Sequence, residues 1–199
     1  MRGQVLSGIL AGPEEHFIAM NIRLVGHRCS GKTSVGKLLA SKLEIPFWDT
    51  DDLIERRQGM PISQIVETRG WSFFRAKERE VLLEVLDKRD GVVALGGGVV
   101  LDPRNRRDLK EKGVNIWLLA KPETILQRMR QDPKSPSRRP PLRGLSPEEE
   151  LPLLMEERER LYREVAHLEV KTDGRPLEEI VGEILSRLGL LSSLAPKTY

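Results

Sequence analysis

The sequence predicts an α/β fold with three layers, in which a central parallel sheet of about five strands lies between two layers of helices. Short apolar runs typical of buried strands alternate along the chain with longer segments in which apolar residues have helical spacing. Parallel strands need helical connections of this kind, because a tight hairpin turn joins antiparallel strands. A glycine-rich loop lies between the first apolar run and the first helical segment, and neither a repeat nor a linker divides the alternation. The chain is therefore expected to form one α/β domain.

Five short segments are predicted as strands because they are apolar and rich in β-branched or aromatic residues. These segments are residues 22–25, 46–48, 92–95, 115–119 and 168–170. Gly26 ends the first segment, Asp49 ends the second and Gly96 follows the third. Open α/β sheets bind ligands at the carboxyl ends of their strands, so the residues that follow these segments are candidates for a binding site.

Helical segments are predicted between these strands. They begin near Lys32, Leu53, Pro61, Trp71, Pro122, Pro147 and Pro176. In the first of them, Val35, Leu39 and Leu43 have the spacing of one apolar helix face. Pro122 stands at the first turn of its segment, a helical position that tolerates proline.

The composition fits one domain of ordinary size. The chain has 199 residues, of which 39% are hydrophobic and 32% are charged, and this length is enough to form a core. We expect the domain to span residues 20–190, between a flexible extension at residues 1–19 and a tail at residues 191–199. Met20 is an alternative start of the chain, which the sequence does not decide. The apolar stretch at residues 5–11 is short and precedes acidic residues, which argues against a signal peptide.

The charge pattern and the cysteine count argue against several classes of function. The formal net charge is +3, and no patch alternates basic and aromatic residues, so a nucleic-acid partner is not expected. No apolar run approaches the ~20 residues of a membrane-spanning helix. Cys29 is the single cysteine, so no internal disulfide can form and a reducing cytoplasm is the expected location. The small basic excess also suits an enzyme with anionic substrates.

Residues 26–33 read Gly-His-Arg-Cys-Ser-Gly-Lys-Thr and match the phosphate-binding pattern G-x-x-x-x-G-K-T. A predicted strand before the loop and a predicted helix after it argue against a chance match. Backbone N–H groups in such a loop surround phosphate oxygens, and the helix N-terminus adds its positive end. Lys32 is expected between the β- and γ-phosphates of ATP, and the Thr33 hydroxyl on Mg²⁺. The other predicted nucleotide-binding residues of this segment are Gly26, Cys29, Ser30, Gly31 and Ser34.

Two residues of the phosphate loop allow a second interpretation. His27 is more simply explained as a packed or solvated spacer than as an acid–base group. Cys29 lies near a helix N-terminus, where the pKa of a thiol can fall, so a redox-sensitive loop is the alternative to a small residue that fits the turn. We favour the small residue.

The segment Asp49-Thr50-Asp51 follows the second predicted strand directly. Of two such carboxylates, one can hold Mg²⁺ through water and the other can accept the proton of a hydroxyl. Either can also cap the helix that follows, and capping is compatible with both roles. Residues 96–98 are three glycines after the third strand, which leave a bare backbone for a small ligand unless they form a plain loop.

Three arginines complete the candidate site. Arg75 follows two phenylalanines on a predicted helix, and Arg158 lies in the charged helix that begins near Pro147. Arg139 lies in a segment between residues 132 and 147 that is rich in proline and basic residues and is interpreted as a mobile lid. Taken singly, each would be interpreted as a solvated arginine.

In combination, these motifs resemble the shikimate kinase family. The matching pieces are, in order, G-x-x-x-S-G-K-T, D-T-D, F-R-x-x-E, L-G-G-G, R-P-x-L and R-x-x-L-Y, and they span Gly26 to Tyr162. Many families share the phosphate loop, whereas its combination with D-T-D, L-G-G-G and the lid R-P is far more specific. The resemblance covers about residues 21–190. It implies a P-loop fold like that of the nucleoside monophosphate kinases, with a mobile lid at about residues 130–147.

The resemblance implies an enzyme that uses ATP and Mg²⁺ to phosphorylate the 3-hydroxyl of shikimate, a small cyclohexene carboxylate on the pathway to chorismate and the aromatic amino acids. It also implies a monomer. Asp51 would bind the acceptor hydroxyls and take the proton, while Asp49 and Thr33 would hold Mg²⁺. Arg75 and Arg158 would clamp the substrate carboxylate, which a guanidinium group fits with two hydrogen bonds.

The remaining roles are carried over from the family in the same way. Arg128 would lie against the adenine, and Arg139 would close onto the phosphates and the substrate. The backbone that lines the acceptor pocket would be that of Gly96, Gly97 and Gly98, and the catalytic set would be Lys32, Asp51 and Arg139. The chain departs from the family pattern at Cys29, where glycine is common, at Pro141 and in the length of the lid.

Two other functions are compatible with parts of the sequence. Another small-molecule kinase, such as a gluconate kinase or a nucleotide-type kinase, would share the phosphate loop and fold class, but it gives no reason for Arg75 and Arg158. A nucleotide-binding regulator without catalysis would tolerate loss of the acceptor site, whereas the matched residues of that site are intact here.

Overall fold

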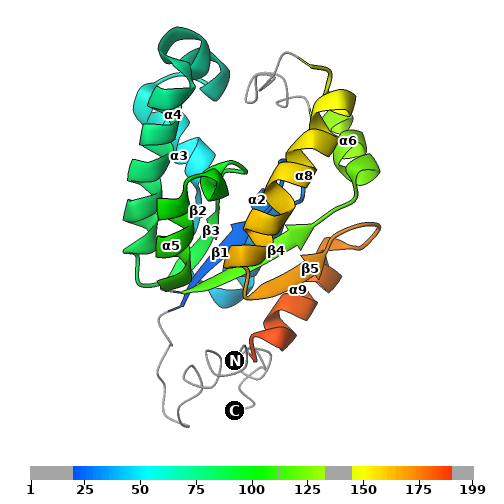
Figure 1. Cartoon of the computed structure of the whole chain (residues 1–199). Coiled ribbons are helices and arrows are strands. Elements are labelled where there is room, and N and C mark those ends of the chain that lie inside the picture. Colours follow the sequence, from blue (N-terminus) through cyan, green and yellow to red (C-terminus); the bar gives the residue numbers. More distant parts are fainter. Residues whose placement is uncertain (1–19, 112, 133–144, 190–199) are drawn as a thin grey trace, which may run out of the picture.

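A five-stranded sheet is the centre of the structure, a computed structural model that describes residues 20–111, 113–132 and 145–189. Within these residues, the strands are parallel and ordered β2-β3-β1-β4-β5 (Figure 1). Their bounds are Asn21–Val25 (β1), Phe47–Asp49 (β2), Gly91–Ala94 (β3), Val114–Leu119 (β4) and Leu168–Lys171 (β5). The predicted parallel sheet is confirmed, and each predicted strand agrees with the observed one to within one residue at each end.

The strand order places the phosphate loop at the middle of the sheet. β1 lies between β3 and β4, with Ile22 in register with Val92 on one side and Val114 on the other. All residues of β1 are buried, as expected of a central parallel strand that is covered on both faces. The loop that follows β1 therefore leaves the sheet at the centre of its carboxyl edge.

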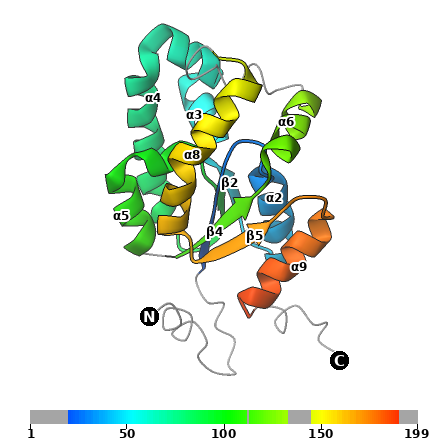
Figure 2. The same cartoon turned by 45° about the vertical axis from the view of Figure 1, so that its right-hand side comes forward.

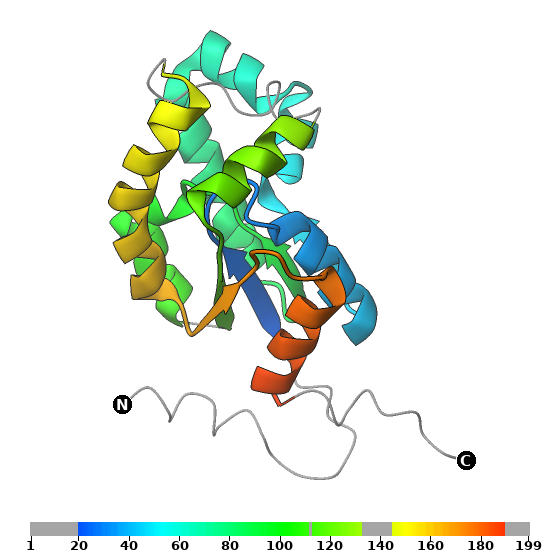
Figure 3. The same cartoon turned by 90° about the vertical axis from the view of Figure 1, so that its right-hand side faces the viewer.

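Helices cover both faces of the sheet, as predicted. Their bounds are Lys32–Leu43 (α2), Thr50–Gln58 (α3), Ile62–Leu86 (α4), Pro103–Glu111 (α5), Pro122–Gln131 (α6), Pro147–Val165 (α8) and Leu177–Arg187 (α9), with a short 3₁₀ helix at Val99–Leu101. Figure 3 shows α2 and α9 on one side of the sheet and α8 on the other. Ile22 and Leu24 of β1 pack into the core beneath α2 and α9. Val25 and Trp117 pack into the core that α4 and α8 cover.

Helix α4 is kinked at Gly70, whose backbone angles of φ 79° and ψ 166° are not helical. The sequence predicts two helical segments here, one from Pro61 and one from Trp71, and the kink lies between them. The part of α4 after the kink has a different axis from the part before it, and this second part bears Arg75 and Glu78 of the site described below.

Helix α5 was not predicted. Of its nine residues, only Asn105 and Leu109 are buried, so the sequence contains no apolar face that marks a helix. Polar contacts hold it instead. Asn105 Nδ2 donates to the carbonyl of Val99 at 2.8 Å, and its Oδ1 accepts from Arg79 at 2.9 Å.

Three predicted segments lie outside the described residues: the extension at residues 1–19, the tail at residues 191–199, and residues 133–144 of the lid. In the part of the chain that the structure describes, no helix combines the length and hydrophobicity that a membrane span requires.

Arg23 places a buried charge in the central strand. Its side chain is fully buried, and none of its guanidinium nitrogens has a hydrogen-bond partner among the described residues. Asn21 lies two residues earlier on the same face of β1, and Asn115 lies opposite Arg23 in register on β4. Burial lowers the pKa of Arg23 to about 10, so the group is still charged at neutral pH. The guanidinium therefore bears a desolvation cost that no described carboxylate offsets.

Replacing Arg23 with methionine is expected to raise the free energy of unfolding by about 2 kcal/mol, because an apolar side chain of similar length removes the buried charge. Urea unfolding of the variant and the wild type would measure the change. Arg23→Lys keeps a charge at the same place and should give no gain. If Arg23→Met were less stable than the wild type, the guanidinium would make favourable contacts in solution, for example with internal water.

Candidate active site

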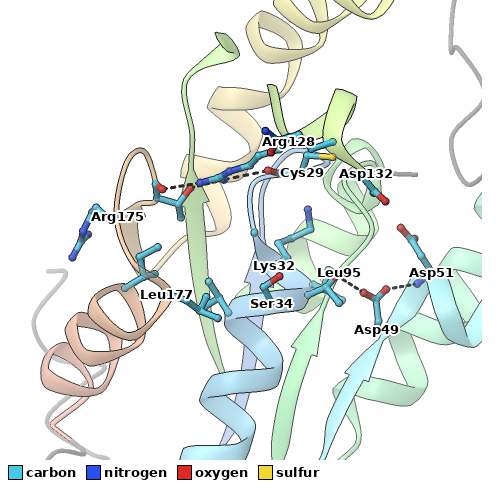
Figure 4. A pocket seen from close by; sticks show the side chains of 16 residues that line it. Cys29, Lys32, Ser34, Asp49, Asp51, Leu95, Arg128, Asp132, Arg175 and Leu177 are labelled. Atoms are coloured by element: carbon cyan, nitrogen blue, oxygen red, sulfur yellow. Dashed lines mark hydrogen bonds between the residues drawn. The ribbon is translucent and has the colours of Figure 1, made fainter. Parts of the chain in front are cut away.

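Two cavities open at the carboxyl edge of the sheet. At this edge α3, α4, α6 and α8 stand around the loop that joins β1 to α2 (Figure 2). The larger cavity, of about 560 Å³, is lined by the phosphate loop, the end of β2, α6 and residues that follow β5 (Figure 4). The smaller cavity, of about 80 Å³, is lined by the phosphate loop, α4, α8 and the glycines after β3. Asp51, in the first turn of α3, lines both cavities. The two cavities therefore adjoin at this carboxylate.

The phosphate loop depends on unusual backbone conformations. Gly26 has φ 141°, and a Cβ there would lie 2.6 Å from the carbonyl oxygen of Leu118, so a side chain has no room. Cys29 has φ 56°, in the left-handed region that residues other than glycine rarely adopt. The interpretation of Cys29 as a small residue that fits the turn stays a prediction.

Lys32 closes the loop from inside. Its Nζ donates to the carbonyls of Gly26 at 2.8 Å and His27 at 2.6 Å. Helix α2 begins at Lys32, and its N-cap residue is Gly31, which has no side chain to cap the helix. The N–H groups of this helix N-terminus are therefore directed toward the larger cavity without a side-chain cap, as an anion site requires.

Most of the predicted nucleotide-binding residues line the larger cavity. They are Cys29, Gly31, Lys32, Thr33, Ser34 and Arg128. Gly26 and Ser30 do not line it, and Ser30 is fully buried within the loop. Arg139 lies outside the described residues, so its predicted position has no structural counterpart here.

Arg128 of α6 joins the phosphate loop to the end of β5 (Figure 4). Its Nη1 donates to the carbonyl of Cys29 at 3.2 Å, and its Nη2 donates to the carbonyl of Thr172 at 2.8 Å. Thr172 and Arg175 also line the larger cavity, although no motif in the sequence marks them. Leu177 and Ile180 of α9 add an apolar wall at the same end.

Asp49 lies between Thr33 and Asp51 and forms a hydrogen bond with each. Thr33 Oγ1 donates to Asp49 Oδ2 at 2.8 Å, and the Asp51 N–H donates to Asp49 Oδ1 at 3.1 Å. Asp49 is thus the N-cap of α3, and it also shares a cavity wall with Thr33. Asp49 therefore caps α3 and lines the cavity at once, and its part in holding a metal stays a prediction.

The oxygens of Thr33 and Asp49 fit a magnesium ion. Mg²⁺ takes a few oxygen ligands from protein and keeps the rest as water and phosphate, so a hydroxyl and a carboxylate side by side are sufficient. Burial and the neighbouring Asp51 carboxylate both raise the pKa of Asp49. A divalent cation would favour the charged carboxylate and so reverse this shift.

Three arginines line the smaller cavity, and two of them, Arg75 and Arg158, are the predicted pair for a carboxylate. Arg75 Nη1 forms an ion pair with Glu78 Oε2 at 2.6 Å, and Arg158 Nη1 donates to the carbonyl of Gly97 at 3.4 Å. A Cβ on Gly98 would lie 2.2 Å from Arg75 Nη1, so glycine is what lets this guanidinium lie against the backbone. Gly96 does not line the cavity, but it separates Asp51 from Glu78, because a Cβ there would lie 2.9 Å and 2.7 Å from their carboxylate oxygens.

Glu78 and two aromatic rings hold Arg75 in place. Glu78 is 2% exposed, and burial raises its pKa while the Arg75 charge opposes the rise. The Arg75 guanidinium also lies 5.4 Å from the Trp71 ring centroid and 5.3 Å from that of Phe74. Both rings line the smaller cavity and give it an apolar wall. The sequence motif F-R-x-x-E included Glu78 but predicted no role for it.

Two residues of the phosphate loop also face the smaller cavity. Arg28 forms an ion pair at 3.1 Å with Glu150, which is buried in the first turn of α8. His27 is 5% exposed, and burial together with the charge of Lys32 lowers its pKa to about 3. The imidazole is therefore neutral at physiological pH, in agreement with its interpretation as a packed spacer.

Comparison with known proteins points to one family. A family model described as "Shikimate kinase" matches residues 28–189. The shikimate kinase of Syntrophus aciditrophicus is 41% identical over 175 residues, which cover 84% of this chain and 90% of the relative. A solved structure of the shikimate kinase from Acinetobacter baumannii in complex with shikimate is 37% identical with a TM-score of 0.80, and the match covers 91% of this chain and 98% of the other.

A gluconokinase from Sinorhizobium meliloti matches with a TM-score of 0.56 at 20% identity, over 92% of this chain and 100% of the other, and this likeness shows the fold alone. The likeness to shikimate kinases is of another kind, because the relative named above is 41% identical over 175 residues and the family model matches residues 28–189. The chain belongs to the shikimate kinase family, whose members are phosphotransferases that use ATP and act on an alcohol group.

Proposed function

We propose that this protein transfers the γ-phosphate of ATP to the 3-hydroxyl of shikimate. The observation that carries the proposal is the position of Asp51 on the wall of both cavities. The larger cavity has a phosphate loop, and the smaller one has the guanidinium groups of Arg75 and Arg158, which suit a carboxylate. A hydroxyl beside Asp51 in the smaller cavity would therefore face a phosphate that is held in the larger one.

The residues divide the work of the reaction among them. Asp51 accepts the proton of the attacking hydroxyl, and Lys32 together with the loop N–H groups neutralises charge on the phosphates. The transition state of phosphoryl transfer is loose, so positioning and charge neutralisation supply most of the rate. The phosphate loop and the arginines of α4 and α8 lie on either side of Asp51, so they can position the two substrates and neutralise charge.

The acceptor is held at its two ends. Arg75 and Arg158 bind the shikimate carboxylate through paired N–H groups. Trp71 and Phe74 offer an apolar wall to one face of the ring. An aromatic wall suits a ring better than the open polyol chain of gluconate, which favours shikimate over that alternative.

Thr33 and Asp49 are the residues that would hold Mg²⁺, and the ion would supply positive charge next to the phosphate oxygens. The larger cavity also continues to the apolar surface of Leu177 and Ile180, where the adenine has room beside Arg128. The role of Arg139 in closing over the phosphates stays part of the proposal.

The proposal is tested by following ADP release with ATP, Mg²⁺ and shikimate, with quinate, gluconate and no acceptor as controls. Release that depends on shikimate supports the proposal. Release that depends on gluconate instead would preserve the role of the phosphate loop and contradict the assignment of the arginines. ATP binding without turnover for any acceptor would favour a regulator.

Replacing Thr33 with valine is expected to raise the Mg²⁺ concentration needed for half-maximal activity by about tenfold, because one oxygen ligand is lost with little change in shape. Titration of activity with Mg²⁺ at fixed ATP would measure the shift. Thr33→Ser keeps the hydroxyl and is the matched control, so its titration should resemble that of the wild type. Equal titration curves for all three proteins would remove Thr33 from the metal site.

A further inference from the structure

Tyr162 lies directly behind the smaller cavity but does not line it. The side chain comes from α8, one turn after Arg158, and it is fully buried. Its hydroxyl donates to the carbonyl of Gly97 at 2.5 Å. Burial raises the pKa of Tyr162 far above neutrality, so the hydroxyl remains a donor at every physiological pH.

The carbonyl of Gly97 is shared between two side chains of α8. Arg158 Nη1 donates to the same oxygen at 3.4 Å, a longer contact than that of the tyrosine. A carbonyl oxygen has two lone pairs, so the tyrosine occupies one direction and the guanidinium is left with the other. The hydroxyl thereby limits how Arg158 can approach the backbone, and Arg158 has donors left for a carboxylate.

The Tyr162 ring also contacts the phosphate loop. It meets the His27 ring edge to face, with the ring centroids 5.0 Å apart, and it stacks on Trp117 of β4 at 5.9 Å. The carbonyl of His27 is in turn held by Lys32 at 2.6 Å. The ring of Tyr162 thus contacts the phosphate loop, and its hydroxyl contacts the glycine loop that lines the acceptor cavity.

The two loops are packed closely at this point. A Cβ on Gly97 would lie 3.5 Å from the Gly26 carbonyl oxygen and from the Arg28 amide nitrogen, and 3.6 Å from the Tyr162 hydroxyl. A Cβ at Gly97 would therefore be in ordinary van der Waals contact with both the backbone of the phosphate loop and the tyrosine, so all three lie next to one another. A small movement of the tyrosine hydroxyl would change the position of the Gly97 carbonyl relative to both loops.

We propose that Tyr162 is a positioning residue for the acceptor site, which acts through the Gly97 carbonyl and Arg158 and does not touch the acceptor itself. The inference rests on the proposed function, because it concerns the shikimate carboxylate that Arg158 would bind. Loss of the hydroxyl leaves the partly buried Gly97 carbonyl with the guanidinium as its remaining side-chain donor. Arg158 is then drawn toward Gly97 and away from the carboxylate.

The test compares Tyr162→Phe with the wild type in the ADP-release assay. Phenylalanine keeps the ring and its contacts with His27 and Trp117, so the change is confined to the hydroxyl. We expect the KM for shikimate to rise about fivefold to tenfold, as the loss of one hydrogen-bonded contact predicts, while the KM for ATP changes by less than about twofold. An equilibrium titration with shikimate should show the same rise in the dissociation constant.

Val165→Ala is the matched control for stability. Val165 is buried one turn further along α8 in the same core, and it lines neither cavity. It should lower the unfolding temperature without changing the KM for shikimate. An unchanged shikimate KM in Tyr162→Phe, or an equal rise in Val165→Ala, would overturn the inference. If the wild type shows no shikimate-dependent ADP release, the proposed function fails and the inference fails with it. If the wild type is active, the KM for shikimate in Tyr162→Phe tests the role of Tyr162 alone.

Discussion

Replacing Asp51 with asparagine is expected to lower kcat for shikimate-dependent ADP release by about 10²- to 10⁴-fold, the usual contribution of a group that takes a proton from the reacting atom. Asparagine keeps the size of the side chain and one hydrogen-bonding oxygen, but its amide does not accept the proton of the attacking hydroxyl. The phosphate loop keeps all of its contacts in this variant. The KM for ATP should therefore change by less than about threefold, and the loss should appear in kcat.

Asp52→Asn is the matched control, since it makes the same chemical change one residue further along α3. Asp52 lines neither cavity, so turnover should stay within about twofold of the wild type. Full kcat in Asp51→Asn would mean that positioning and charge neutralisation carry the reaction without a protein base. Equal losses in both variants would assign the effect to α3 as a whole and not to the Asp51 carboxylate.

The sheet could be predicted from the sequence because each strand is a short apolar run with a marked end. β1 is buried on both faces, so Ile22, Leu24 and Val25 form an apolar signal that Arg23 interrupts. The kink at Gly70 was likewise visible as the boundary between two helical patterns. Helix α5 could not be predicted, because it is held by Asn105 and other polar contacts, and polar contacts leave no period in the sequence.

The site was predictable where its residues follow strands. The phosphate loop follows β1, Asp49 is the last residue of β2, and the three glycines begin two residues after the end of β3, so one sheet edge brings them together. The contacts that hold these residues in place depend on pairs far apart in the chain. Arg28 pairs with Glu150 across 122 positions, and Tyr162 bonds to Gly97 across 65. No local pattern encodes such a pair, because each partner alone has the sequence environment of an ordinary helix or loop residue.

Replacing Arg75 with methionine is expected to have two large effects with separate causes. The KM for shikimate should rise about 100-fold, because the carboxylate loses a charge-assisted pair of hydrogen bonds. The free energy of unfolding should also fall by about 2 to 3 kcal/mol, because Glu78 is left buried without its cation. Steady-state kinetics and urea unfolding would measure the two effects independently.

The double variant Arg75→Met/Glu78→Gln separates binding from stability. A neutral glutamine needs no cation, so most of the stability should return while the KM for shikimate stays high. The pH dependence of stability gives a further check. Burial raises the pKa of Glu78, and in Arg75→Met the charge of Arg75 no longer opposes that rise. With its folded-state pKa raised above the unfolded value, Glu78 stabilises the fold as a neutral acid at low pH and destabilises it as pH rises through the folded-state pKa.

The stability deficit of Arg75→Met should therefore shrink on acidification, whereas the double variant should show no such trend. Recovery of both stability and shikimate KM in the double variant would contradict the assignment of Arg75 to the carboxylate. Arg75 would then serve to neutralise Glu78, and Arg158 would be left to bind the carboxylate alone. A high shikimate KM in a protein of restored stability would instead place the guanidinium of Arg75 on the substrate, since the one property that the double variant does not recover is the positive charge that Arg75 adds to the smaller cavity.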